Sequence, residues 1–149
     1  MADLRQFLQL FKPLPGNRYL QVTTMRNEIS EALELLLAQV GGKLNVILYK
    51  EENLDFNKSF HALPREHDMV ILQNIFHSHQ NKSMLLKAAY TTLANTANVI
   101  IMEKKGLMNI EEIKQMLEEN EFRASNQMDV LEAYDLVLAK KMHMWGNGL

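Results

Sequence analysis

Apolar residues spaced three and four positions apart predict four helices, because that spacing puts their side chains on one helical face. The four stretches are residues 1–12, the segment from Asn27 to Val40, residues 82–94 and the segment that begins at Asn109. Pro13 and the Gly41-Gly42 pair end the first two, since proline and glycine commonly terminate helices. Asn109 also has Glu112 at the capping-box distance.

Short apolar runs between polar or turn residues predict the strands. The predicted strands are Arg18–Val22, Leu44–Tyr49, Asp68–Leu72 and Val99–Met102, followed by a hairpin of Gln127–Val130 and Tyr134–Ala139. Strands that alternate with helices imply right-handed βαβ units. We therefore expect an α/β fold, a single doubly wound, mainly parallel, Rossmann-like sheet with helices on both faces and a C-terminal antiparallel hairpin. Ligands of such sheets bind beyond the carboxyl ends of the strands.

Composition narrows the classes of protein. The 149 residues are 47% hydrophobic and include no cysteine, which excludes thiol nucleophiles and thiolate metal sites. A net charge of −2 gives no strong field for nucleic acid, and no apolar run is long enough to span a membrane. The first residues do not have the pattern of a secretion signal, so we expect a cytoplasmic protein. We expect one domain over residues 1–149, with a tail at 142–149.

Several segments together resemble the class I S-adenosylmethionine-dependent methyltransferases. The matching segments are 16–27 (GNRYLQVTTMRN), 68–79 (DMVILQNIFHSH), 91–94 (TTLA), 97–103 (ANVIIME), 109–122 (NIEEIKQMLEENEF) and 133–141 (AYDLVLAKK). They follow the family's order from its first strand and cofactor loop to its terminal strand. The resemblance implies a methyltransferase-type fold with S-adenosylmethionine (SAM) as the possible cofactor.

The chain departs from the family pattern where the cofactor is bound. The family's first strand ends in an acid followed by a glycine-rich turn, because glycines let the backbone approach the cofactor closely. Here Gln21 stands at the acid, and Thr23, Met25 and Asn27 stand at the glycines. None of the six glycines of the chain lies in this loop. The sequence therefore predicts an eroded cofactor site.

The second strand departs as well. Tyr49 and Lys50 stand where the family has a ribose-binding acid. About 18 residues separate Tyr49 from Asp68, which is too few for two helices and a strand in series. We expect one edge of the family's sheet to be shortened or missing.

The resemblance places candidate cofactor-binding residues after the first and third predicted strands. They are Gln21, Thr23, Thr24, Met25, Arg26, Asn27, Gln73 and Asn74. The amides of the helix start and Arg26 favour an anion. In the alternative that we favour, the turn is closed, and its hydroxyls and Asn27 only cap the helix.

Two histidines and the tail complete the candidates. His77 and His79 are candidate acid–base groups because imidazole titrates near neutral pH, with helix capping as the alternative. No metal site is predicted, because neither histidine has a ligand at the i+3 or i+4 position. In the tail, Met142, Met144 and Trp145 predict an interface that folds back onto the chain or docks on a second subunit.

Two functions follow from these patterns. The first is a methyltransferase-like, non-catalytic binding or regulatory module that has a protein partner or forms a homo-oligomer through its tail or a sheet edge. The alternative is a SAM-dependent methyltransferase that binds its cofactor through the atypical loops 23–27 and 73–79.

Overall fold

The computed structural model describes residues 4–50 and 60–142, which contain four helices and six strands. The helices are α1 (Leu4–Leu8), α2 (Glu28–Ala38), α4 (Lys82–Thr92) and α5 (Ile110–Glu119). The strands are β1 (Arg18–Thr23), β2 (Lys43–Leu48), β3 (His67–Gln73), β4 (Leu93–Lys104), β5 (Phe122–Met128) and β6 (Tyr134–Lys141).

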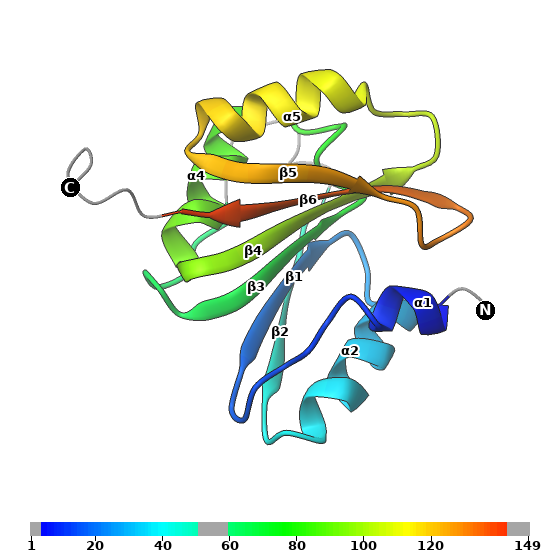
Figure 1. The fold of residues 1–149 in the computed structure, drawn as a ribbon, viewed down its shortest axis with the longest axis vertical. Coiled ribbons are helices and arrows are strands. Elements are labelled where there is room, and N and C mark those ends of the chain that lie inside the picture. The colour runs from blue at the N-terminus through cyan, green and yellow to red at the C-terminus, as the bar shows by residue number, and fades with distance from the viewer. Residues whose placement is uncertain (1–3, 51–59, 143–149) are drawn as a thin grey trace.

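The six strands form one sheet in the order β2-β1-β3-β4-β6-β5 (Figure 1). Strands β1 to β4 are parallel to one another, whereas β6 is antiparallel to both β4 and β5. This arrangement confirms the predicted α/β fold class with its C-terminal antiparallel hairpin. In this part of the chain β2 is an edge strand, as expected if one edge of the sheet is shortened.

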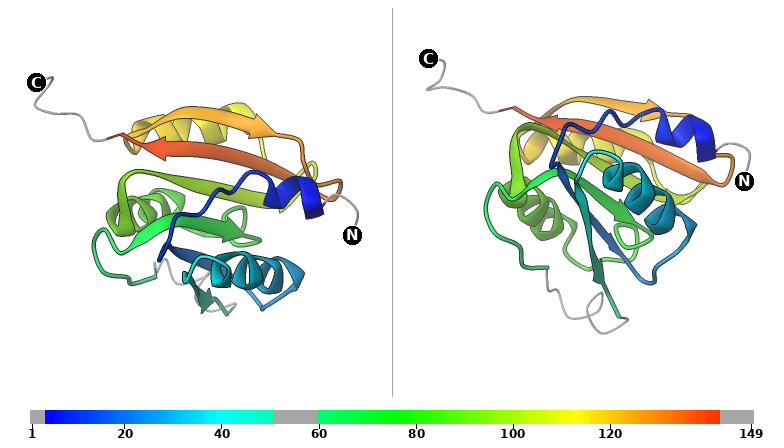
Figure 2. Two further views of the ribbon diagram at one scale, coloured as in Figure 1. Left: turned by 60° about the horizontal axis from the view of Figure 1, so that its bottom comes forward. Right: turned by 90° about the horizontal axis from the view of Figure 1, so that it is seen from below.

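Helices cover both faces of the sheet and enclose two hydrophobic clusters. Figure 2 shows α1 and α2 on one side and α4 and α5 on the other. The cluster under α4 and α5 includes Leu72, Leu85 and Leu117, and the cluster under α1 and α2 includes Leu33 and Ile71. All five of these side chains are fully buried. Each fully buried side chain of this kind stabilises the fold by about 1.5–3 kcal/mol.

Helix α2 begins where the sequence predicts. The Asn27 side chain accepts hydrogen bonds from the N–H groups of Ile29 and Ser30, while the Ser30 hydroxyl accepts from the Asn27 N–H. This capping box satisfies free amides of the first helical turn. It fixes the path of the chain between β1 and α2.

Three predicted boundaries are wrong. Helix α1 ends at Leu8, not before Pro13, and Phe11 lies in the following turn while still packing its ring 5.0 Å from the Phe7 ring. Strand β4 begins at Leu93, earlier than the predicted Val99. Strand β5 covers 122–128, not 127–130. The prediction fails because the half-polar pattern of an edge strand hides its period of two.

A buried histidine joins three elements at the amino end of β3. His67 is 2% exposed; its Nδ1 lies 2.8 Å from Thr92 Oγ1, and its Nε2 lies 2.8 Å from Asn45 Nδ2. Thr92 donates its own proton to the Leu63 carbonyl, so His67 Nδ1 donates to Thr92 and Nε2 accepts from Asn45. Burial lowers the pKa of His67 below its ordinary 6.5.

A buried lysine joins β6 to the end of α4. Lys141 Nζ donates to the carbonyls of Tyr90 and Leu93, both at 2.8 Å, and lies 4.4 Å from the centre of the Tyr90 ring. Burial and the nearby Arg65 lower its pKa. A cation here complements the carboxyl end of the helix.

The structure describes one of the three predicted interface residues of the tail. Met142 is 38% exposed, whereas Met144 and Trp145 lie outside the described residues. No helix in the described ranges is long and apolar enough to cross a membrane.

Candidate functional site

A network of buried amides joins the carboxyl ends of β1 and β3. Gln21 Nε2 donates to Gln73 Oε1 at 2.6 Å, and both side chains are almost completely buried. Gln21 Oε1 accepts from the Ser30 hydroxyl at 2.5 Å, and Gln73 Oε1 accepts a second bond from Asn27 Nδ2 at 3.2 Å. Two candidate residues that are 52 positions apart in the sequence are therefore in direct contact.

Tyr134 extends this network to β6. Its hydroxyl oxygen accepts from the side-chain amides of Gln73 and Asn74, each at 3.2 Å. Asn74 has a positive φ of 62°, a conformation that asparagine adopts more readily than most residues, and its N–H donates to the Met102 carbonyl. The turn after β3 is thus held to both β4 and β6.

The loop between β1 and α2 combines exposed and buried positions. Thr24, Met25 and Arg26 are exposed, and Arg26 Nη2 lies 2.8 Å from Glu34 Oε1 on the outside of α2. Thr23 is fully buried, yet within the described residues its Oγ1 has no hydrogen-bond partner. Such an unpaired buried hydroxyl costs about 1–3 kcal/mol.

Glu103, at the carboxyl end of β4, holds the loop that follows β3. Its Oε2 accepts hydrogen bonds from the N–H groups of Phe76 at 2.9 Å and His77 at 3.2 Å. Burial raises the pKa of Glu103, whereas the two donors and the nearby Lys82 act in the opposite direction. The carboxylate fixes the backbone from which the His77 side chain projects.

The two candidate histidines have different surroundings. The His77 side chain is exposed. His79 is 1% exposed, its Nδ1 accepts the Asn81 N–H at 3.0 Å, and its ring lies 5.9 Å from the buried ring of Tyr49. The structure therefore supports the capping alternative for His79 next to α4. Across residues 4–50 and 60–142, no group of three His, Cys, Asp or Glu side chains is arranged to hold a metal ion.

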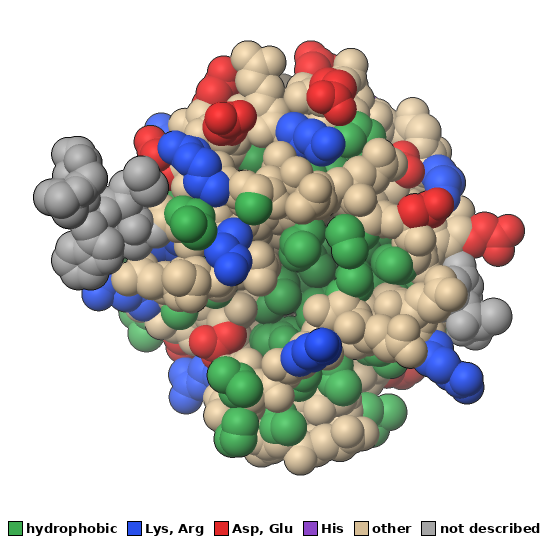
Figure 3. Space-filling view, in the orientation of Figure 1, with side chains coloured by type: hydrophobic (Ala, Val, Ile, Leu, Met, Phe, Trp, Pro, Cys, Tyr) green, Lys and Arg blue, Asp and Glu red, His purple; other side chains and the backbone are tan. Residues whose placement is uncertain are grey.

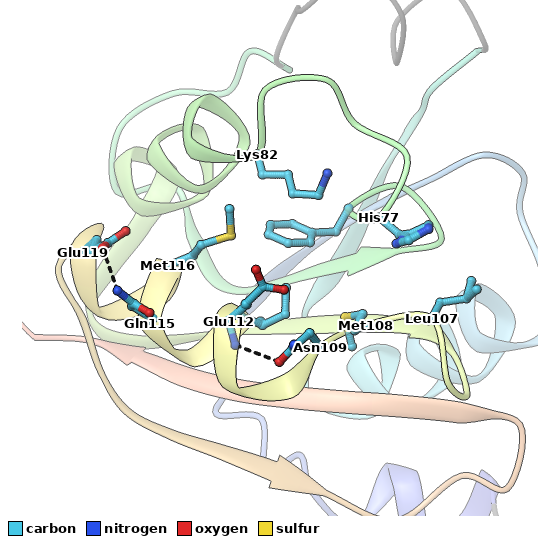
Figure 4. A pocket seen from close by; sticks show the side chains of 11 residues that line it. His77, Lys82, Leu107, Met108, Asn109, Glu112, Gln115, Met116 and Glu119 are labelled. Carbon is cyan, nitrogen blue, oxygen red and sulfur yellow. Dashed lines mark hydrogen bonds between the residues drawn. The ribbon is translucent and has the colours of Figure 1, made fainter.

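A cavity of about 570 Å³ lies beside His77, between the start of α4 and the side of α5 that faces α4 (Figure 4). The residues around it mix apolar side chains with both signs of charge. They are Phe76, His77, Lys82, Leu107, Met108, Asn109, Glu112, Ile113, Gln115, Met116 and Glu119. The cavity offers an apolar floor with polar groups at its rim, a combination typical of small-molecule sites.

Sequence reasoning missed three residues of this region, namely Ser30, Glu103 and Tyr134. Ser30 is the third residue after Asn27, and this spacing was a usable signal for a capping box. Glu103 was detectable as an acid directly after the apolar run of β4. Tyr134 had no local signal, because its contacts with Gln73 and Asn74 join residues 60 or more positions apart.

No family profile and no curated protein matches this sequence. Solved structures do match the fold. A SAM-dependent methyltransferase from Aquifex aeolicus has a TM-score of 0.76 and 15% identity, with 93% of this chain and 89% of that chain covered. A SAM-dependent methyltransferase from Archaeoglobus fulgidus has a TM-score of 0.64 and 18% identity, with 94% and 92% covered.

A third similar structure belongs to a longer chain. Phosphoethanolamine N-methyltransferase 2 of Haemonchus contortus, in complex with phosphomonomethylethanolamine and S-adenosylhomocysteine, has a TM-score of 0.69 and 9% identity. The alignment covers 95% of this chain but 52% of that one, so the chain spans about half the length of this methyltransferase. Together these similarities show that the chain has the fold of the class I SAM-dependent methyltransferases.

Proposed function

We propose that this protein binds SAM or S-adenosylhomocysteine at the carboxyl ends of β1 and β3 and acts as a methyltransferase with an atypical cofactor loop. The similar structures are methyltransferases over nearly the whole of this chain, which favours the enzymatic alternative over the non-catalytic module. At less than 20% sequence identity, the similarity to these structures shows the fold only, and the methyltransferase activity is our inference.

The observation that carries the proposal is the buried Thr23 hydroxyl. Its Oγ1 lies at the end of β1 without a partner in the described ranges, at the position where the resemblance expects a cofactor-contacting glycine. A hydroxyl is able to donate one hydrogen bond and accept two. Because Thr23 is buried, a cofactor would reach this hydroxyl only when the exposed residues 24–26 move aside, and it would then meet a polar side chain where the usual glycine offers only backbone.

Other residues of this chain would shape the site. Gln21 and Gln73 hold the ends of β1 and β3 together, and Glu103 positions the loop that carries His77. When bound, SAM supplies a methyl group on a sulfonium centre. His77 lines the cavity beside this loop, where its imidazole is placed to exchange a proton with an acceptor molecule.

Calorimetric titration of the full chain with SAM and with S-adenosylhomocysteine tests the proposal. We expect binding in the micromolar range, and no heat at millimolar ligand would overturn it. Thr23→Val replaces the hydroxyl with a methyl group of similar size. If Thr23 is a ligand, its loss should raise Kd about fivefold, the equivalent of one hydrogen bond of about 1 kcal/mol. Thr91→Val, at an exposed position on α4 outside the candidate site, is the matched control and should bind as the wild type does.

The non-catalytic module remains the second candidate because of one observation. Asn27 already satisfies the amides of Ile29 and Ser30, and Arg26 is paired with Glu34, so neither group is left for a ligand carboxylate. This candidate predicts no heat with either ligand.

A further inference from the structure

Strand β2 lies at the edge of the sheet, and one side of its main chain is not paired with any described strand. In the described part of the chain its neighbour is β1 alone. The N–H of Lys43 donates to the Asn17 carbonyl at 2.9 Å, and the N–H of Tyr49 donates to the Thr23 carbonyl at 2.7 Å. Main-chain groups alternate in direction along a strand, so those of residues 44, 46 and 48 point away from β1.

The two edges of the sheet differ in how they are protected. Edge strand β5 carries a register shift between Arg123 and Asn126 and a left-handed residue, Ala124, with φ 55°. Such irregularities prevent pairing with another strand. Strand β2 pairs with β1 without any shift, and its one charged residue is Lys43 at the start. β2 is therefore the edge that is suited to accept another strand.

Apolar side chains accompany this open edge. Leu48 on β2 is 50% exposed and Leu35 on α2 is 70% exposed. A hollow lies between α2 and the start of β2, lined by Glu31, Glu34, Leu35, Ala38, Gly42, Lys43 and Leu44. Figure 3 shows hydrophobic side chains gathered over the lower part of the molecule, where Figure 1 places α2 and the segment between α1 and β1.

We propose that a second copy of this chain pairs with the open edge, with the two β2 strands antiparallel about a twofold axis at Val46. Residues that face each other across antiparallel strands share one face of the sheet. A register centred on Val46 puts Leu44 opposite Leu48 of the second copy and Val46 opposite Val46. It also pairs the outward-pointing main-chain groups with one another. The two sheets become one, with an apolar ladder on the side of the α2 helices.

The strand is complementary to itself, which favours a second copy over an unrelated chain. In the register centred on Val46, each of Leu44, Val46 and Leu48 faces an apolar residue of the second copy on the α2 side of the sheet. No charged side chain stands opposite another at these three positions.

Sedimentation of the full chain tests the association. At a concentration of about 100 µM, the sedimentation mass of the wild type should be twice the 17.2 kDa of one chain. Leu48→Lys should lose the dimer, because it puts a charge opposite Leu44 of the second copy. Leu107→Lys is the matched control; Leu107 is 45% exposed in the loop before α5, away from β2, and its variant should remain dimeric. A monomeric wild type, or a Leu48→Lys dimer, would overturn the proposal; the former result would assign the edge to a different partner.

Cysteine substitution tests the register independently, since the chain contains no cysteine. Val46→Cys puts two thiols opposite each other on the twofold axis, with Cα atoms about 5.5 Å apart, within the range of a disulfide. It should form a covalent dimer on mild oxidation. Leu48→Cys is more exposed but lies opposite residue 44, so it should cross-link more slowly. Equal or reversed rates would contradict the proposed pairing, and near-ultraviolet circular dichroism should show native packing in both variants.

Discussion

Replacing Gln73 with leucine should reveal how much the buried amide network contributes to stability. The variant removes three hydrogen bonds, from Gln21 at 2.6 Å, from Asn27 at 3.2 Å and to Tyr134 at 3.2 Å. Each such bond contributes about 1 kcal/mol, and the fully buried amide group of Gln21, left without an acceptor, adds about 1–3 kcal/mol. Allowing for the apolar gain of leucine, we expect Gln73→Leu to lower the free energy of unfolding by about 2–4 kcal/mol.

The double variant makes the prediction more specific. Gln21→Leu combined with Gln73→Leu removes both partners and leaves neither buried amide unpaired. The double variant should therefore cost at least about 1 kcal/mol less than the sum of the two single variants. Urea unfolding followed by fluorescence measures all three values, and Gln127→Leu, at an exposed position on β5, should change stability by less than about 0.5 kcal/mol.

Two results would refute this reasoning. A loss of less than about 1 kcal/mol in Gln73→Leu would mean that the amides are not desolvated as the structure describes them. Strict additivity in the double variant would mean that Gln21 and Gln73 do not interact in the folded protein.

Three further predictions concern titration and turn geometry. Burial lowers the pKa of His67 below 6.5, so the unfolded chain gains a proton that the folded chain does not; stability should be flat above about pH 7 and fall as the pH drops through 6.5. Urea unfolding of His67→Gln should lack this fall, and an unchanged profile would contradict the assignment. Burial raises the pKa of Glu103 above 4.5, so the wild type should gain stability relative to Glu103→Gln as the pH falls toward 4.5; a constant difference between the two proteins would refute this. Gly42→Ala should lower the melting temperature more than Gly41→Ala does. A Cβ at position 42 meets the Asn17 carbonyl oxygen, whereas at position 41 there is open space and only the positive φ of 67° costs about 1–2 kcal/mol. The reverse order of melting temperatures would contradict this prediction.

The sequence predicts the buried elements of this fold best. Strands β3 and β4 are apolar over residues 69–72 and 99–102, because other elements cover them on both faces, and this continuity is legible without a structure. Helix α2 has a cap, an apolar face and a glycine stop, all of which are local signals. Strand β5 lacks such signals, since an edge strand with a register shift has neither a continuous apolar run nor strict alternation.

The candidate site is predicted in position but not in detail. Parallel topology brings the ends of β1 and β3 together, and Gln21 and Gln73, which the resemblance places among the candidate residues, are in contact. Whether Gln21 contacts Gln73 or a ligand depends on side-chain packing that the sequence does not express. The contact of Tyr134 with this group depends on where β6 enters the sheet, which is a property of the whole chain.

The position of β6 has a consequence for how the protein is made. β6 is the last described strand, yet it lies between β4 and β5 and is the strand through which β5 joins the sheet. A nascent chain that has not yet reached Tyr134 leaves one side of β4 without its neighbour, at the apolar residues 99–102. Exposed strand edges of this kind drive aggregation of incomplete chains. Synthesis must therefore pass residue 141 before the sheet closes, and truncation upstream of β6 should yield insoluble protein, not a smaller folded one.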